Sequence, residues 1–450
     1  MKINYVYMLS LFMIWGCEGF LDERPDKSIL IPTTVEDIRA LLDNDSDLNV
    51  VPGFGLLSSD DLWITDDGWT ALSTPAEQNA YIWEKDIWAG AESADWSRMY
   101  HQIFIANVAL DQLGLLPQSQ EVDYLMGEAL FHRAHAHFML AQVFSPVYHA
   151  ENAASTFGIP LRLNSEILER SPRVELNVFY KAILQDLEVA YSVLPETQSL
   201  KTRPSRLSAK ALEARVHLVM GDYKSAGNAA NLVMENSAYS LMDYNSQDST
   251  ARYPFAKYNS EVVFHSVILS YSFSGVGNVN VWIHPDIYES YGMWDLRRVL
   301  YGQGRSNAGF SFKGQYTGNF GRFGGIALDE LYFIKMECLA RTGQSAAALD
   351  LLNDFLETRF VTGKFIPFNI NGIQELLEVI LEEKRKSLVY RGVNWIDLRR
   401  LNQEEEFKRV IAREWMGEEV KLNYGSKKYV LPIPQGELNL NPIPQTDRED

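Results

Sequence analysis

The chain has 450 residues, 46% of them hydrophobic and 22% charged, which is the composition of a folded globular protein and excludes a disordered one. Its formal net charge of −18 would repel a phosphate backbone, so a nucleic-acid partner is not expected. Only two cysteines are present, Cys17 and Cys338, so the fold depends on its hydrophobic core and not on a disulfide framework.

A short apolar run at residues 6–16 follows the cation Lys2 and ends at Cys17. As a helix this run would be roughly 15–18 Å long, whereas crossing a bilayer core takes ~20 apolar residues. The run is therefore typical of a secretory signal. The residues Ile14-Trp15-Gly16-Cys17 resemble a bacterial lipobox, in which the cysteine is lipidated and becomes the new N-terminus. We predict a lipoprotein signal peptide at residues 1–16 and a lipid anchor at Cys17; the alternative is an ordinary signal peptide with a chance cysteine.

Helical periodicity dominates the chain after a loop-rich stretch at residues 51–92, where glycines, paired aspartates and tryptophans interrupt the pattern. Apolar side chains recur on one stripe in four long segments, which we predict to be helices: residues 96–113, 125–143, 178–194 and 372–390. Near the C-terminus, Pro-Ile-Pro-Gln occurs twice. This part is predicted to be an extended tail packed against the body.

Two further helical pairs, at residues 207–233 and 328–355, share one pattern. A helix leads to Gly221 in the first pair and to Gly343 in the second, and a small alanine follows each glycine at the same offset. A helix, a glycine turn and a second helix with small residues at the crossing are typical of tetratricopeptide repeats. The sequence therefore predicts a mainly α fold built from such repeats, with Cys338 as a small buried hydrophobe.

Residues 240–327, between the two pairs, have a different composition. Aromatic residues alternate there with glycine, asparagine and serine, and residues 261–269 have the pattern of a strand. We predict a loop-rich insertion that carries short strands, and insertions of this length are usually functional or mobile.

Several segments carry a family resemblance when they are taken in order. They are Cys17-Glu-Gly-Phe-Leu-Asp-Glu-Arg-Pro-Asp26, Tyr100-His-Gln-Ile-Phe-Ile-Ala-Asn107, Gly127-Glu-Ala-Leu-Phe-His-Arg-Ala134, Glu383-Lys-Arg-Lys-Ser-Leu-Val-Tyr-Arg-Gly-Val-Asn-Trp-Ile-Asp-Leu-Arg399 and the Pro-Ile-Pro-Gln tail. Over nearly the whole chain this succession resembles the SusD/RagB family of outer-membrane nutrient-binding lipoproteins. Ser387 and Arg391 stand where an acid is common in that family, and we expect both on a helix surface.

The resemblance implies a single domain over residues 17–450, mostly helical, with tetratricopeptide-like units and the insertion at about 240–327. It implies a lipid-anchored protein at the outer membrane that captures oligosaccharides and delivers them to a SusC-like TonB-dependent barrel transporter. In some members the ligand is a peptide, so a RagB-like peptide-binding protein is the alternative. Neither catalysis nor a cofactor is implied.

A glycan-binding site needs flat apolar faces for sugar rings and polar groups for hydroxyls. Two loop regions have this composition, and the sugar site of the family is likewise built from aromatic residues in these two regions. We therefore predict a ligand site made of Trp63, Asp66, Asp67, Trp69, Trp282, Tyr288, Tyr291 and Trp294. The alternative is that these rings belong to the core, which we expect for Trp83, Trp88 and Trp395.

Three other groups of residues could indicate a different chemistry. The pairs Asp60-Asp61 and Asp66-Asp67 could serve an all-helical glycoside hydrolase as general acid and base, but acidic pairs in loops are usually solvated or bind a structural calcium ion. His132, His135 and His137 cannot converge on one metal from a single helix, so no metal site is predicted. Residues 382–386 form a charge run, which a solvated, ion-paired helix face explains.

Overall fold

The computed structural model describes residues 32–274, 279–306 and 309–449 of the chain. The predicted signal peptide at residues 1–16 and the predicted anchor Cys17 lie outside these residues. Within the described part, none of the helices combines the length and the apolar character that crossing a membrane requires.

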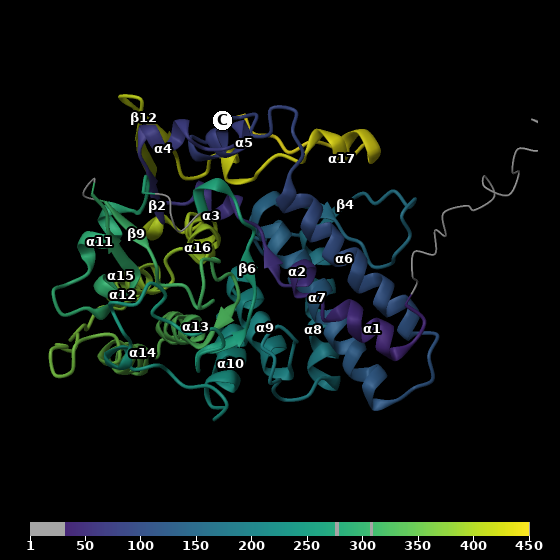
Figure 1. The fold of residues 1–450 in the computed structure, drawn as a ribbon, viewed down its shortest axis with the longest axis horizontal. Coiled ribbons are helices and arrows are strands. Elements are labelled where there is room, and N and C mark those ends of the chain that lie inside the picture. Colours follow the sequence, from purple (N-terminus) through teal and green to yellow (C-terminus); the bar gives the residue numbers. More distant parts are fainter. Residues whose placement is uncertain (1–31, 275–278, 307–308, 450) are drawn as a thin grey trace, which may run out of the picture.

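A row of long helices forms the body of the molecule (Figure 1). They are α6 (Ala94–Leu113), α7 (Gln120–Phe144), α8 (Leu176–Val193), α9 (Arg206–Met220), α10 (Tyr223–Met234), α13 (Leu328–Arg341), α14 (Ser345–Glu357) and α15 (Ile373–Ser387). Each helix from α6 to α14 packs against the next one in this order, and α15 packs against α13. The predicted mainly α fold is confirmed, and the four periodic segments are all helices.

The two predicted repeat units are present. Helices α9 and α10 are joined at Gly221 with φ of 76°, and α13 and α14 are joined at Gly343 with φ of 82°. Both values lie in the left-handed region, which glycine adopts without a steric penalty. Where α10 meets α13, a Cβ added to Gly227 would lie 3.0 Å from the Cβ of Cys338, so a small residue permits this close crossing. Cys338 is buried as predicted, and burial raises the pKa of its thiol to about 12.

A buried ion pair joins the two repeat units. The guanidinium of Arg215 on α9 donates to both carboxylate oxygens of Glu330 on α13, at 2.7 and 2.6 Å. It also donates to the carbonyl oxygen of Gly325 at 3.0 Å. Both side chains are almost fully buried, so each charge depends on the other for its compensation.

Shorter helices and strands surround this row (Figure 1). The short helices are α1 (Val35–Leu42), α2 (Asp45–Leu48), α3 (Phe54–Ser58), α4 (Asp66–Thr70), α5 (Pro75–Tyr81), α11 (Pro285–Ser290), α12 (Leu296–Tyr301), α16 (Val393–Leu401) and α17 (Gln435–Leu440). Helix α1 lies beside α6 and α7, and α12 lies near α15 on the opposite side. Three of the short helices, α3, α4 and α5, lie within residues 51–92, so that stretch is less irregular than predicted.

The strands form six two-stranded sheets among the described residues. They are β1 (Val50–Val51), β2 (Leu62–Ile64), β3 (Phe157–Pro160), β4 (Arg173–Glu175), β5 (Val262–Phe264), β6 (Val267–Ile268), β7 (Val281–Ile283), β8 (Gly302–Gly304), β9 (Phe310–Phe312), β10 (Ile326–Ala327), β11 (Ile411–Trp415) and β12 (Glu418–Leu422). The strand predicted at residues 261–269 is divided into β5 and β6, which pair with β10 and β1. The hairpin of β11 and β12 was not predicted.

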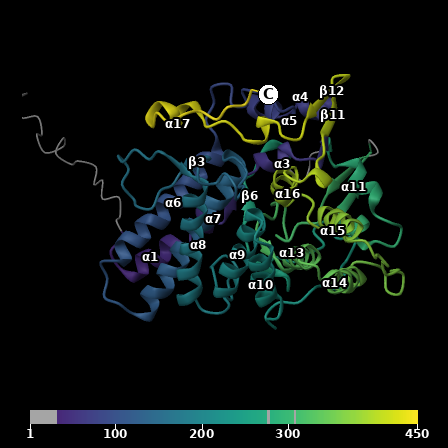
Figure 2. The ribbon, with the colours of Figure 1, turned by 180° about the vertical axis from the view of Figure 1, so that it is seen from behind.

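The C-terminal tail runs along one edge of the molecule, beside α4 and α5 (Figures 1 and 2). The backbone N–H of Leu431 donates to Val143 on α7, and the indole of Trp88 donates to the carbonyl of Pro432 at 2.7 Å. The predicted packing of the tail is confirmed, although α17 interrupts its extended course.

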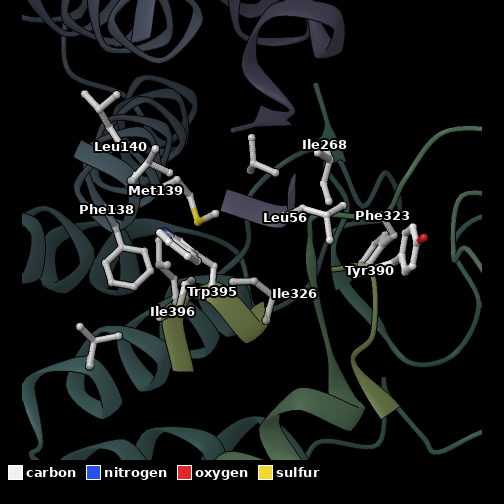
Figure 3. Close-up of a cluster of buried hydrophobic side chains, with 14 of the residues drawn as sticks. Leu56, Phe138, Met139, Leu140, Ile268, Phe323, Ile326, Tyr390, Trp395 and Ile396 are labelled. Atoms are coloured by element: carbon white, nitrogen blue, oxygen red, sulfur yellow. The ribbon is translucent and has the colours of Figure 1, made fainter. Parts of the chain in front are cut away.

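Trp395 on α16 lies in the main core, beside Phe138, Met139 and Ile396 (Figure 3). A Cβ added to Gly55 on α3 would lie 3.0 Å from its indole, so α3 packs directly on this ring. Trp83, Trp88 and Trp395 are each at most 4% exposed, and the prediction that they are core residues is confirmed.

The charge run at residues 382–386 does not form the solvated helix face that was predicted. Only Glu382 is exposed, whereas Glu383, Lys384 and Lys386 are buried and Arg385 is half-buried. Glu383 accepts from Arg297 at 2.6 Å, and Lys384 pairs with Asp397 at 2.8 Å. These charges face partners in the interior and not solvent.

Ser387 and Arg391 are likewise buried and do not lie on a helix surface. The hydroxyl of Ser387 accepts from Arg297 at 2.8 Å, and Arg391 pairs with Asp329 at 2.8 Å. Both side chains therefore belong to interior ion-pair networks.

Candidate functional site

Two of the predicted site residues lie directly opposite each other. Strand β2 pairs antiparallel with β7, and Trp63 is the register partner of Trp282. Residues opposite each other on antiparallel strands point to the same face, with Cβ atoms roughly 5 Å apart. Both indoles are half-buried, whereas Leu62, Ile64, Val281 and Ile283 on the other face are buried. We call the pair Trp63 and Trp282 the aromatic ledge.

The indole of Trp282 is held from two sides. Its Nε1–H donates to the carbonyl oxygen of Val279 at 2.8 Å. The backbone of Gly309, just before β9, lies against the ring, since a Cβ added there would be only 1.9 Å from Cε2. Glycine is required at this position for the backbone to approach so closely. The ring of Trp63 meets the ring of His284 edge to face, with centroids 5.9 Å apart.

Helix α4 follows β2 and carries the two predicted aspartates at the surface. Asp66 and Asp67 are exposed, and Asp66 Oδ1 accepts from the backbone N–H of Met416 in the turn between β11 and β12 at 3.0 Å. Trp69 is packed differently from the ledge. Its Nε1–H donates to Gln78 at 3.0 Å, and its ring meets Trp415 edge-on at 5.1 Å. Trp69 therefore supports the contact between α4 and β11.

Tyr288 and Tyr291 are buried. Tyr288 is 6% exposed and stacks on Phe310 with ring centroids 3.7 Å apart. Tyr291 is 1% exposed, and its hydroxyl donates to the carbonyl of Lys386 at 2.7 Å. Protein atoms cover both rings, so we do not carry these two residues into the proposed site.

Trp294 is exposed but has different neighbours from the ledge. Its side chain is 46% exposed, and the ammonium of Lys364 lies 5.0 Å from its ring. Its carbonyl oxygen accepts from the backbone N–H of Val361 at 2.9 Å. Trp294 therefore belongs with the segment after α14 and not with the ledge.

Beneath the ledge, Asp60 and Asp61 are buried, which corrects the expectation of a solvated pair in a loop. Asp60 accepts from Arg385 at 2.8 Å and from Arg409 at 2.5 Å, and Asn394 donates to both carboxylates. Buried in this network, the pair has no access to a saccharide chain at the surface, so its suggested role as general acid and base is not supported.

The two carboxyls respond oppositely to this environment. Burial acts to raise the pKa of Asp60, but Arg409 and Arg385 outweigh burial and hold it well below its usual value. Burial and the neighbouring Asp60 charge raise the pKa of Asp61 to about 7. Asp61 is thus a carboxyl that becomes neutral near physiological pH.

Sequence reasoning missed the residues that hold the ledge from behind. The hydroxyl of Tyr81 on α5 hydrogen-bonds both the N–H and the carbonyl of Ile64, at 2.9 and 3.2 Å. The hydroxyl of Tyr390, between α15 and α16, donates to the carbonyl of Trp282 at 2.8 Å. Local spacing gave no signal for either role, because each hydroxyl bonds the backbone of another segment, 17 residues away for Tyr81 and 108 residues away for Tyr390.

Histidines 132, 135 and 137 are buried on α7, and burial lowers the pKa of all three. His137 Nδ1 hydrogen-bonds the carbonyl of Arg133 at 2.9 Å. Within the described ranges, no three or more His, Cys, Asp and Glu side chains come together as a metal-binding group.

Two family models match the chain. A model described as starch-binding and associating with the outer membrane matches residues 19–218, and the SusD family model matches residues 328–445. Between the two matches lies the segment that contains β7 and Trp282.

Known relatives cover almost the whole chain at low identity. The SusD-like protein P2 of Formosa agariphila is 24% identical, with 98% of each chain aligned, and the SusD-like protein P38 of the same organism is 22% identical, with 90% of this chain and 92% of the relative aligned.

Solved structures share the fold. A SusD superfamily protein of Bacteroides vulgatus has a TM-score of 0.76 at 20% identity, covering 93% of this chain and 99% of its own. A second protein of that organism, described as a SusD-like carbohydrate binding protein, has a TM-score of 0.68 at 17% identity, covering 91% and 97%. Because both family models match and these structures share the fold, we conclude that the chain belongs to the SusD/RagB family.

Proposed function

We propose that this protein is a carbohydrate-binding protein that captures oligosaccharides on the aromatic ledge. The observation that supports the proposal most is the register of β2 and β7, which sets Trp63 directly opposite Trp282 with both indoles half-buried. Indole faces on neighbouring strands provide flat apolar surfaces for the C–H faces of successive sugar rings.

Polar groups beside the ledge suit sugar hydroxyls. Asp66 and Asp67 are exposed on α4, and His284 follows Ile283 at the end of β7. Carboxylates accept hydrogen bonds from hydroxyl groups, and the neutral imidazole of His284, whose Nδ1 accepts from the backbone N–H of Asp286 at 3.3 Å, has its Nε2–H to donate. Burial lowers the pKa of His284 to about 4, so its ring is neutral at physiological pH.

The family description and a carbohydrate-binding relative support the same ligand class. We extend the proposal to the cellular setting: a single domain, lipidated at Cys17 and held at the outer membrane, passes its ligand to a SusC-like TonB-dependent barrel transporter. Its task is binding and delivery, without catalysis, and the sequence itself supports the anchor through the lipobox at residues 14–17.

Affinity electrophoresis of the purified protein in gels containing starch, xylan, pectin, laminarin or ulvan tests the ligand class. We expect at least one polysaccharide to retard the protein, and Trp63→Ala to weaken binding of that polysaccharide about tenfold, because one stacking face is lost. Tyr424→Ala is the matched control, since Tyr424 is an exposed aromatic residue, 49% accessible, in the loop after β12.

Equal retardation of the wild type and Trp63→Ala would show that the ledge is not the binding site. Binding of a peptide library in the absence of any polysaccharide binding would contradict the carbohydrate class and favour the RagB-like alternative. For the anchor, mass spectrometry of the mature N-terminus is expected to find an acylated Cys17, and an unacylated terminus would refute the lipid anchor.

A further inference from the structure

Tyr390 has an unusual backbone conformation in a buried position. It lies in the link between α15 and α16 with φ of 65°, and its side chain is 1% exposed. The predicted helix at residues 372–390 therefore ends before it, at Ser387. A residue with a Cβ adopts positive φ only at an energetic cost, and it stays there when the surroundings hold it.

The contacts of Tyr390 reach all three strands around the ledge. Its backbone N–H donates to Asp61 Oδ2 at 3.0 Å, immediately before β2. Its hydroxyl donates to the carbonyl of Trp282 on β7 at 2.8 Å. Its ring stacks on Phe312 of β9, with centroids 4.8 Å apart and planes 16° from parallel.

Tyr390 is itself fixed by the interior. It lies at the end of the buried cluster that contains Phe323, Ile326 and Trp395 (Figure 3). The guanidinium of Arg322 lies 5.0 Å from the ring of Tyr390 and donates to the carbonyls of Ser274 and Phe312, at 3.1 and 2.9 Å. Tyr390 thus connects β7 to the buried body of the protein, as Tyr81 does for β2.

We propose that Tyr390 is a positioning residue for oligosaccharide binding, which sets the relative placement of Trp63 and Trp282 without touching the ligand. The inference rests on the proposed function of the aromatic ledge. Tyrosine supplies both a ring that stacks on Phe312 and a hydroxyl that reaches the carbonyl of Trp282 from this strained position.

Tyr390→Phe removes the hydroxyl and keeps the ring, so it isolates the hydrogen bond to Trp282. Tyr180→Phe is the matched control, because Tyr180 on α8 is also 1% exposed and its hydroxyl accepts from Gln142 at 3.1 Å, remote from the ledge strands. We expect both variants to lower Tm to a similar extent. Tyr390→Phe alone should weaken binding of the polysaccharide that retards the wild type, by roughly three- to tenfold.

Amide hydrogen exchange gives a readout that needs no ligand. Peptides covering β2 and β7 should exchange faster in Tyr390→Phe than in the wild type or Tyr180→Phe, whereas peptides covering β11 and β12 should not change. Wild-type affinity of Tyr390→Phe would overturn the proposal and leave Tyr390 a purely structural residue, and so would wild-type exchange in β2 and β7.

The two proposals fail in different ways. If Trp63→Ala binds like the wild type, the ledge is not the site, and the proposed function fails whatever Tyr390→Phe does. If Trp63→Ala loses binding while Tyr390→Phe retains full affinity, the proposed function stands and the positioning role is refuted.

Discussion

Replacing Gly309 with alanine tests how closely the ledge depends on the segment beside it. The added Cβ would lie 1.9 Å from Cε2 and 2.1 Å from Cδ2 of Trp282. Ordinary contact begins near 3.4 Å, so the indole or the start of β9 must move by about 1.5 Å. Trp282 is also held through Nε1 and its carbonyl, so a movement of the indole strains at least one of those hydrogen bonds, and a movement of Gly309 shifts the start of β9 away from the ring.

The magnitude follows from the packing. Overpacking of a close contact typically costs about 1–3 kcal/mol of stability. A displaced indole loses stacking on the sugar, which is about 0.5–1.5 kcal/mol, or roughly two- to tenfold in Kd. Gly309→Ala should therefore weaken oligosaccharide binding and lower Tm only modestly.

The Kd is measured by isothermal titration calorimetry with an oligosaccharide derived from the polysaccharide that retards the wild-type protein in the gel. Gly304→Ala is the control within the same pair of strands, because its added Cβ would be 3.7 Å from the ring of Phe310, an ordinary contact. If Gly309→Ala and Gly304→Ala bind equally well, the reasoning about the ledge is refuted.

Three predictions concern stability. Trp395→Ala should lower the free energy of unfolding in urea by about 3–5 kcal/mol, since it opens a cavity beneath α3, and a loss below 1 kcal/mol would contradict its role as a core anchor. Asp61→Asn should become more stable relative to the wild type as pH rises from about 4 to 7. Because its pKa is raised, the folded wild type keeps a proton over this range that the unfolded chain has already released, so its free energy of unfolding falls by about 1.4 kcal/mol per pH unit; a difference independent of pH would refute this. Glu330→Gln should cost about 3–5 kcal/mol by leaving Arg215 charged and unpaired, and Arg215→Met combined with Glu330→Leu should recover most of it; a double variant as unstable as Glu330→Gln would exclude this explanation.

The helical scaffold could be predicted because its signals are local. Apolar stripes at helical spacing, and the glycines at 221 and 343, act within a few residues of themselves, and helices form from contacts near in sequence. The order of motifs along the chain was enough to indicate the family.

Burial of charged groups could not be predicted from local spacing. Glu382 and Lys386 have the spacing of a solvated pair, yet Lys386 is buried and its neighbour Glu383 pairs with Arg297. Asp60 is likewise in the interior because Arg385, Asn394 and Arg409 reach it from more than 300 positions along the chain. Whether a charge meets water or a partner depends on which segments fold against it.

The candidate site shows the same division. Composition alone determined that residues 51–92 and the insertion are rich in aromatic and acidic side chains, because tryptophan and aspartate occur there outside any helical stripe. Only the tertiary structure decided that Trp63 and Trp282 meet, that Tyr288 and Tyr291 are covered, and that Trp294 lies elsewhere. The two strands are separated by more than 200 residues and are contacted by Tyr81, Tyr390 and Gly309 from other segments, and no local pattern encodes such contacts.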